Sequence, residues 1–352
     1  MQFIKSDMNI NFIGFRTVAY ILSISLVLIS IASLIIHKGP RYGVDFEGGT
    51  SIQIKFQNSV NIEDIKKGLA ETGIEKSSVQ RFGTDTDHEF QIRTPLSFMA
   101  DSNFTDSLKD RLAKITGVAV IDVSLDMVGP QISQDLRKKA LLAMFFALLL
   151  IAIYISGRFE LKWMMSGLMA AAIGLPVYFI TQIDKLSFMN VSAGMPFLIL
   201  FALVVSIAFC WYLELKFALG AIVALVHDVT ITVGIFSLMN IEFTLPIIAA
   251  LLTIIGYSLN DTIIVYDRIR ENTTKSTRAN LETVINKSIN ETLSRTILTS
   301  LTTLLVVLAL YLFGGGVIHN FAFAMLIGIA VGTYSSIFVA SPILLAWENK
   351  NK

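Results

Sequence analysis

Asp261 is an acidic residue within an apolar stretch, and this position offers the clearest opportunity for chemistry in the chain. No charged residue occurs from Phe243 to Asn260, so we expect Asp261 to lie inside a membrane helix. An ionisable side chain at that depth costs roughly 2.5–3.5 kcal/mol on insertion scales, and it normally faces a protein interior or a water path. Asn260 and Thr262 flank it, which gives three consecutive polar side chains. A satisfied polar contact between helices is the alternative interpretation.

A second acid, Asp228, follows His227 in the middle of another apolar stretch, and Arg295 opens a third. Carboxylates in a low dielectric bind and release protons near neutral pH, while a nearby arginine favours the ionised form. If the helices adjoin, the two acids and Arg295 would suit a proton path that drives a conformational cycle. Each charge that crosses the membrane potential would deliver about 2.3 kcal/mol per 100 mV. Alternatively, His227 simply satisfies Asp228, which would then have a structural role.

Two acids on neighbouring helices are also what an intramembrane aspartyl protease requires. At 1.5 Å per residue, Asp228 would lie about 16 Å and Asp261 roughly 9 Å above the same membrane face. This difference in depth argues against a protease.

The composition is that of an integral membrane protein, because 54% of the 352 residues are apolar and 16% are charged. A net charge of +1 without a basic block argues against a nucleic-acid partner. Cys210 is the single cysteine, so no intrachain disulfide can form, and the four histidines lack the spacing of metal ligands. We therefore expect no metal, no cofactor other than the proton as coupling ion, and no enzymatic activity.

Eight apolar stretches are long enough to cross about 30 Å of hydrocarbon. The first lacks a small-residue cleavage site and is interpreted as an uncleaved anchor. Basic residues gather in the short loops of one side, which predicts that both termini are cytoplasmic. The long soluble segment is then expected on the opposite, extracytoplasmic side of the cytoplasmic (inner) membrane. The stretches are 17–36, 140–157, 163–183, 186–213, 217–241, 243–266, 296–318 and 320–347.

The soluble segment is expected to fold as one α+β domain. Its periodicity predicts the order β-α-β-β-α-β, the ferredoxin-like arrangement, and no set of nucleophile and base stands out. Gly43, Gly48 and Gly49 are interpreted as turn positions between the first span and this domain. The elements are predicted at 51–56, 62–71, 78–82, 88–93, 104–115 and 118–128.

Two further segments shape the predicted layout. Apolar residues recur at helical spacing within 268–294, which predicts an amphipathic helix on the inner membrane surface or, alternatively, a helix packed under the bundle. The motif Arg158 to Trp163 resembles Tyr212 to Phe217, which suggests a duplicated or inserted hairpin. The chain is accordingly divided into 1–37 (terminus and first span), 38–138 (soluble domain), 139–157 (second span), 158–215 (added hairpin) and 216–352 (bundle with the charged residues).

Several motifs together resemble the SecD/SecF family of the bacterial Sec protein-export machinery. The Asp-Phe-x-Gly-Gly and Asn-Asp-Thr forms favour its SecF branch, and the likeness covers nearly the whole chain. The motifs are Tyr42 to Thr50, Val128 to Pro130, Ala224 to Val229, Asn260 to Asn272 and Leu293 to Thr296.

This resemblance implies a bundle of the resistance-nodulation-division (RND) superfamily that uses proton-motive force to help export preproteins. It places the proton-linked acid at Asp261 and its basic partner at Arg295, with Asp228 as a further recurrent acid. It implies as partners a SecD-like subunit, a YajC-like subunit, the SecYEG channel, the preprotein and the lipid bilayer. A small-molecule or lipid exporter of the same superfamily and a passive assembly scaffold are the alternatives. The supporting motif residues are Asn260, Thr262, His227, Asp45, Gly48 and Gly49.

The chain departs from the family pattern in its eight spans. The family's turn before the Val-His-Asp-Val helix matches the second motif copy, Glu214 to Lys216. The first copy is therefore expected to belong to the added hairpin.

Overall fold

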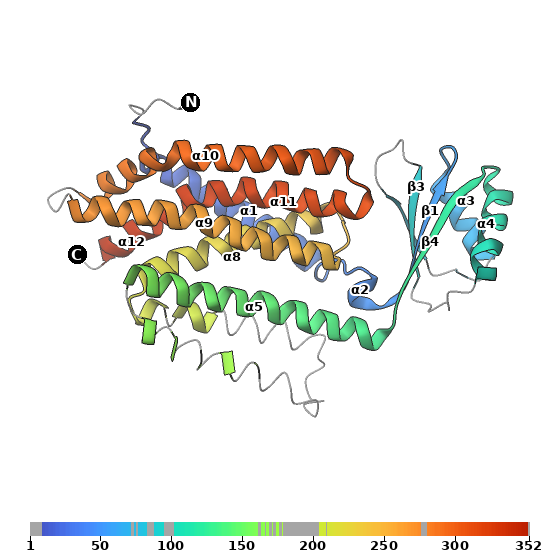
Figure 1. Cartoon of the computed structure of the whole chain (residues 1–352), viewed down its shortest axis with the longest axis horizontal. Coiled ribbons are helices and arrows are strands. Elements are labelled where there is room, and N and C mark those ends of the chain that lie inside the picture. Colours follow the sequence, from blue (N-terminus) through green and yellow to red (C-terminus); the bar gives the residue numbers. More distant parts are fainter. Residues whose placement is uncertain are drawn as a thin grey trace.

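The chain forms a long helical bundle with a small α/β domain at one end (Figure 1). The computed structural model describes residues 9–71, 74, 77–82, 88–94, 102–160, 204–208, 210–275 and 280–350, with isolated positions between 163 and 178. α12 (Ser341–Lys350) lies at the end of the bundle away from the sheet (Figure 1). The helical bundle and the soluble domain therefore form one elongated structure.

Within the described residues, six helical stretches are long and apolar enough to cross a membrane. The sixth is continuous from α11 (Gly316–Ser335) through the π-helical turn η2 (Ser336–Ala340) into α12. The expected spans 163–183 and 186–213 lie almost entirely outside the described residues, so a total of eight remains a prediction. The other five are η1 (Ile13–Phe15) with α1 (Arg16–Ile36), α5 (Pro130–Glu160), α8 (Lys216–Leu238), α9 (Leu245–Lys275) and α10 (Leu281–Phe313).

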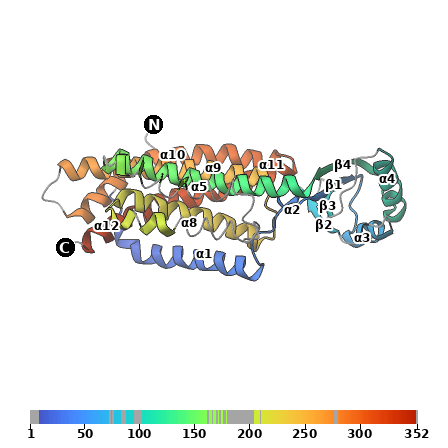
Figure 2. The ribbon, with the colours of Figure 1, turned by 90° about the horizontal axis from the view of Figure 1, so that it is seen from below.

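Small residues let α9 and α11 approach closely. A Cβ on Gly328 would lie 2.3 Å from Ile254, and one on Gly332 would lie 2.9 Å from the Cβ of Ser258. Glycines spaced four apart share one face of a helix, which is a common way for membrane helices to pack. α1 lies on the outer side of α8 (Figure 2). α9 also contacts α8 and α10, so it lies between α8, α10 and α11.

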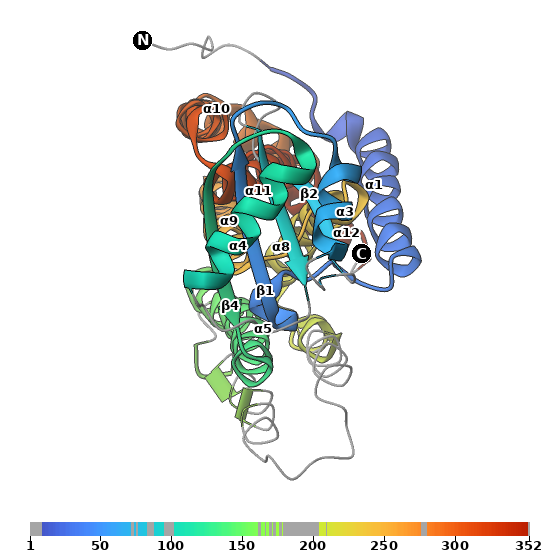
Figure 3. The ribbon, with the colours of Figure 1, turned by 90° about the vertical axis from the view of Figure 1, so that its right-hand side faces the viewer.

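The soluble domain is a four-stranded antiparallel sheet in the order β2-β3-β1-β4, with α3 and α4 on one face (Figure 3). Alternating side chains of β1, such as Ile52 and Ile54, are buried against Leu69 of α3 and Leu112 of α4. The element order agrees with the prediction, and each boundary lies within two residues of the predicted one. The elements are β1 (Gly49–Phe56), α3 (Ile62–Glu71), β2 (Ser78–Phe82), β3 (Glu89–Thr94), α4 (Ser102–Thr116) and β4 (Val120–Val128).

The segment 268–294 does not form a separate helix on the membrane surface. α9 continues to Lys275 and α10 already begins at Leu281, so nearly all of the described residues of this segment belong to the ends of two long helices. Its apolar side chains, including Ile285 and Ile289, are buried in the bundle core rather than facing lipid. These described residues are therefore packed within the bundle as parts of α9 and α10.

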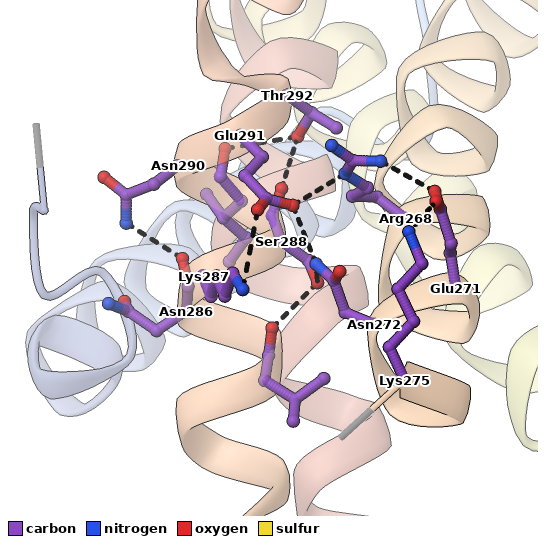
Figure 4. Close-up of polar contacts among 12 residues, drawn as sticks. Arg268, Glu271, Asn272, Lys275, Asn286, Lys287, Ser288, Asn290, Glu291 and Thr292 are labelled. Carbon is purple, nitrogen blue, oxygen red and sulfur yellow. Dashed lines mark hydrogen bonds and ion pairs between the residues drawn. The ribbon is translucent and has the colours of Figure 1, made fainter. Parts of the chain in front are cut away.

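Polar side chains tie these two helix ends together (Figure 4). Asn272 donates to the hydroxyl of Ser288 at 3.0 Å, and the Nε of Arg268 donates to Glu291 at 2.6 Å. Both pairs join α9 to α10 beyond the apolar part of the bundle. They fix the register of the two helices that carry Asp261 and Arg295.

The described residues of the first motif copy, 158–160, contact the bundle, while the predicted hairpin that follows lies almost entirely outside the described residues, so its boundaries remain a prediction. Glu160 Oε1 accepts a hydrogen bond from the backbone N–H of Phe217 at 3.0 Å, and the rings of Phe159 and Phe217 stack at 5.1 Å. Arg158 forms an ion pair with Asp267 at 2.9 Å. The end of α5 therefore meets the start of α8 directly, because the carboxylate satisfies a first-turn amide of that helix.

Candidate functional site

Asp261 lies in the middle of α9 and is 1% exposed, yet its hydrogen bonding is incomplete. Ser300 of α10 is its one hydrogen-bond partner among the described residues, with its hydroxyl 3.4 Å from Oδ2. Oδ1 has no partner there, and neither has the hydroxyl of Thr296, one helical turn before Ser300. Buried polar atoms are normally hydrogen-bonded, and each exception calls for an explanation. Asp261 is therefore a buried carboxylate whose hydrogen-bonding capacity is only partly used by the described residues.

Ser300 connects Asp261 to a short chain of hydroxyl groups. Ser300 Oγ lies 2.7 Å from Thr333 Oγ1, and Thr333 donates to the carbonyl of Ile329 at 2.8 Å. A hydroxyl carries one proton, so a protonated Asp261 can donate to Ser300, which then donates to Thr333. With Asp261 ionised, Ser300 donates to Asp261 and Thr333 donates to Ser300, so Thr333 no longer donates to the carbonyl of Ile329. The chain of hydroxyls thus has one arrangement for each protonation state.

Asp228 of α8 is also buried, at 0% exposure, but it has a full set of donors. Oδ2 accepts from Ser258 of α9 at 2.5 Å and from Ser335 of α11 at 2.8 Å. Oδ1 lies 2.9 Å from Nδ1 of His227. The two serine hydroxyls donate to Asp228, and His227 donates as well in the tautomer that carries a proton on Nδ1; this set matches an ionised carboxylate, which is an acceptor only. The geometry agrees with the structural role considered for Asp228.

The two carboxylates have separate partners but share helices. Ser258 precedes Asp261 by three residues on α9 and binds Asp228 instead. Thr333 and Ser335 are two residues apart on α11. Thr333 contacts Ser300, the partner of Asp261, and Ser335 donates to Asp228. The π-helical turn at Ser336–Ala340 follows immediately, and such turns frequently occur at functional sites.

Arg295 is not in contact with Asp261. It is exposed on α10, and it forms no ion pair with any residue that the structure describes. Its guanidinium nevertheless lies within electrostatic range of Asp261. Arg295 therefore lies near Asp261 without forming an ion pair with it in this conformation.

Asn260 and Thr262 do not join Asp261 in one polar group. Asn260 is exposed, because consecutive helical residues point about 100° apart. Thr262 is buried and donates to the backbone carbonyl of Ser258 at 3.2 Å. Sequence reasoning missed the hydroxyl partners Ser258, Ser300, Thr333 and Ser335. These four hydroxyl residues could have been found in the sequence as polar residues within otherwise apolar spans.

The segment from Tyr42 to Gly49 joins the soluble domain to the start of α9. Asp45 Oδ2 accepts from the N–H of Leu245, the first residue of α9, at 2.9 Å, and so caps the helix that carries Asp261. Gly48 and Gly49 have φ values of 78° and 110°, as expected for turn positions. A Cβ on Gly48 would also lie 3.2 Å from the Cα of Pro130.

Glu242, in the loop before α9, strengthens this junction. It is 8% exposed and pairs with Arg41 at 3.3 Å and with Arg93 of β3 at 3.7 Å. Burial raises the pKa of Glu242, and the two guanidinium groups oppose that shift. Arg93 also donates to Glu47 and to the carbonyl of Tyr42. The junction therefore links a strand of the soluble domain to the loop that leads into α9.

Comparison with protein families identifies two matching models. The model described as "Protein export membrane protein SecD/SecF, C-terminal" matches residues 108–183 and 182–350. The model of the SecD/SecF GG motif matches residues 33–60, which include the junction segment.

Individual relatives agree with the family models. The protein translocase subunit SecF of Desulfurispirillum indicum is 39% identical over 346 residues, which cover 96% of this chain and 92% of the relative. SecF of Vibrio alginolyticus is 36% identical over 344 residues and covers 98% and 91%.

The crystal structure of SecDF from Thermus thermophilus matches with a TM-score of 0.70 and 31% identity. A SecDF structure described as the super-membrane-facing form matches with a TM-score of 0.56 and 29% identity, and covers 98% of this chain. The first match likewise covers 98% of this chain but 40% of the SecDF chain, so our chain spans about two fifths of that protein. Family models, full-length relatives and fold agree: the chain is a membrane protein that belongs to the SecF family of protein translocase subunits.

Proposed function

We propose that this subunit couples proton movement through Asp261 to the late stage of preprotein export across the cytoplasmic membrane. The observation that carries the proposal is the incomplete hydrogen bonding of Asp261, beside a fully satisfied Asp228 in the same bundle. A carboxylate with spare hydrogen-bonding capacity can change its protonation state without dismantling a network. The hydroxyl chain through Ser300 and Thr333 accommodates both states.

Arg295 supplies the charge that responds to this change. With Asp261 ionised, the guanidinium is attracted toward α9, and with Asp261 protonated, that attraction disappears. α9 carries the response to the junction, because Asp45 caps its first turn and Glu242 pairs with Arg93 of the soluble domain. A movement of α9 would thereby reorient the domain. Each proton that crosses the potential supplies about 2.3 kcal/mol per 100 mV.

We also propose on which side of the membrane each part of the chain lies, how many spans it has and which partners it binds. The soluble domain, whose strand order supports a ferredoxin-like class, faces the extracytoplasmic side, and both termini are cytoplasmic. The stretches between α5 and α8 add two spans to the six, for a total of eight. The partners are a SecD-like subunit, a YajC-like subunit, the SecYEG channel and the exported preprotein. Basic residues in the short loops support the orientation.

Export in cells tests the proposal. In cells whose only copy carries Asp261→Asn, we expect slower export of a secreted preprotein, by on the order of tenfold, with residual late-stage export indifferent to a protonophore. A tenfold change corresponds to about 1.4 kcal/mol, less than one proton supplies at 100 mV. Thr253→Ala, which alters an exposed residue about two turns earlier on the same helix and outside the motif, is the matched control and should export like wild type. Normal protonophore-sensitive export in Asp261→Asn would favour the scaffold interpretation instead.

A further inference from the structure

A basic cavity lies where the bundle meets the soluble domain, apart from the two carboxylates. Its volume is about 560 Å³, and its walls come from the end of α1, the junction segment, α5 and the end of α8. Lys38, Arg41 and Arg137 line it, and Glu47 is the one acid among the lining residues. The site is therefore a concave surface with an excess of positive charge.

Ion pairs already engage two of these charged residues. Arg41 is paired with Glu242 at 3.3 Å, while Glu47 is paired with Arg93, which is not a lining residue. Lys38 is exposed and forms no ion pair with any residue that the structure describes. Arg137 lies 4.3 Å from the centre of the Tyr42 ring, a cation–π contact that orients its guanidinium.

The cavity is continuous with exposed apolar side chains. Ile35 and Ile36 are 72% and 74% exposed at the end of α1, directly before the lining residues His37 and Lys38. Met239 is 57% exposed and directly precedes Asn240, which also lines the cavity. The cavity thus lies at the depth where a spanning helix leaves the hydrocarbon for the headgroup region.

From this arrangement we propose that the cavity binds the headgroup of an anionic phospholipid from the leaflet next to the soluble domain. Lys38, Arg41 and Arg137 would contact the phosphate, and the acyl chains would lie along Ile36 and Met239. The adjoining apolar surface favours a lipid over a free phosphate ion, because a soluble anion gains nothing from that surface. The lipid would lie against the junction that holds α9, and this site does not depend on the proposed proton coupling.

Native mass spectrometry of the full chain in detergent tests this site with phosphatidylglycerol, phosphatidylcholine and inorganic phosphate as probes. Wild type should retain phosphatidylglycerol in preference to phosphatidylcholine. Lys38→Gln and Arg137→Gln should each lower that retention by roughly fivefold, the effect typical of one basic side chain near anionic lipid. Lys139→Gln removes the same charge from α5 outside the cavity, where Lys139 pairs with Asp135 at 2.7 Å, and should leave retention unchanged.

Lys38→Gln keeps the test decisive if Arg137→Gln fails to fold, because Lys38 is exposed. Retention equal to wild type in Lys38→Gln would overturn the proposal. Equal loss in Lys139→Gln would also overturn it, because the effect would then reflect total charge. Displacement of phosphatidylglycerol by an equal concentration of inorganic phosphate would identify a soluble-anion site and contradict the lipid assignment.

Discussion

Asp228 and Asp261 are the same residue type, equally buried in the same bundle, and they differ in how completely their oxygens are satisfied. Asp228 accepts from two serine hydroxyls and lies against Nδ1 of His227. Asp261 has one long contact to Ser300 and an oxygen without a partner among the described residues. Burial alone therefore does not identify a functional acid. We propose that this difference in donors separates a carboxylate that holds helices together from one that exchanges a proton.

Removal of each carboxylate should produce the largest contrast. Asp228→Ala leaves Ser258, Ser335 and His227 without their shared acceptor, and should lower the free energy of unfolding by roughly 3–5 kcal/mol. Asp261→Ala leaves Ser300 still bonded to Thr333, and should cost about 1 kcal/mol or less. Unfolding of the purified proteins in mild detergent measures both. Equal losses would show that the two sites do not differ as described.

The contact between α9 and α11 offers a second, smaller contrast. Gly332→Ala would place a Cβ 2.9 Å from Ser258, the donor to Asp228, and should cost roughly 1–3 kcal/mol. Gly256→Ala on α9 meets nothing within 4 Å and should be neutral or stabilise by up to about 1 kcal/mol. The same unfolding assay compares them. A neutral Gly332→Ala would indicate that close packing does not maintain the Asp228 network.

The helix cap at Asp45 should give the smallest change in stability. Asp45→Ala removes the acceptor for the N–H of Leu245 and should cost about 1 kcal/mol, while Asp45→Asn retains a good cap and should cost little. If the cap transmits motion from α9, the alanine variant should also export more slowly than the asparagine variant. Equal export by both, with the expected loss of stability, would restrict Asp45 to a structural role.

The helices and strands of the soluble domain could be predicted from the sequence. The side-chain contacts around Asp261 could not. Strand alternation and helical periodicity placed each element of the soluble domain within two residues, and an acid in an apolar span marked Asp261. The hydroxyls of Ser300 and Thr333 were not identified, because a serine in an apolar helix carries no sign of its partner. The adjacency of Asn260 and Asp261 in the sequence suggested one polar group, but Asn260 points away from Asp261.

The packing of the helix ends could not be predicted from the sequence for a similar physical reason. The amphipathic pattern in 268–294 shows that one face is buried, but not whether protein or lipid buries it. The first motif copy was assigned to the added hairpin by its position in the sequence. In the structure, Glu160 and Phe159 are packed against Phe217, a contact that depends on tertiary proximity.

The central claim is that Asp261, and not Asp228, exchanges a proton. Infrared difference spectroscopy of the purified protein between about pH 5 and pH 8 reports directly on buried carboxyl groups, because a protonated carboxyl has a carbonyl band that the carboxylate lacks. We predict a pH-dependent carbonyl band that disappears in Asp261→Asn and persists in Asp228→Asn. A band that persists in Asp261→Asn and disappears in Asp228→Asn would contradict the account.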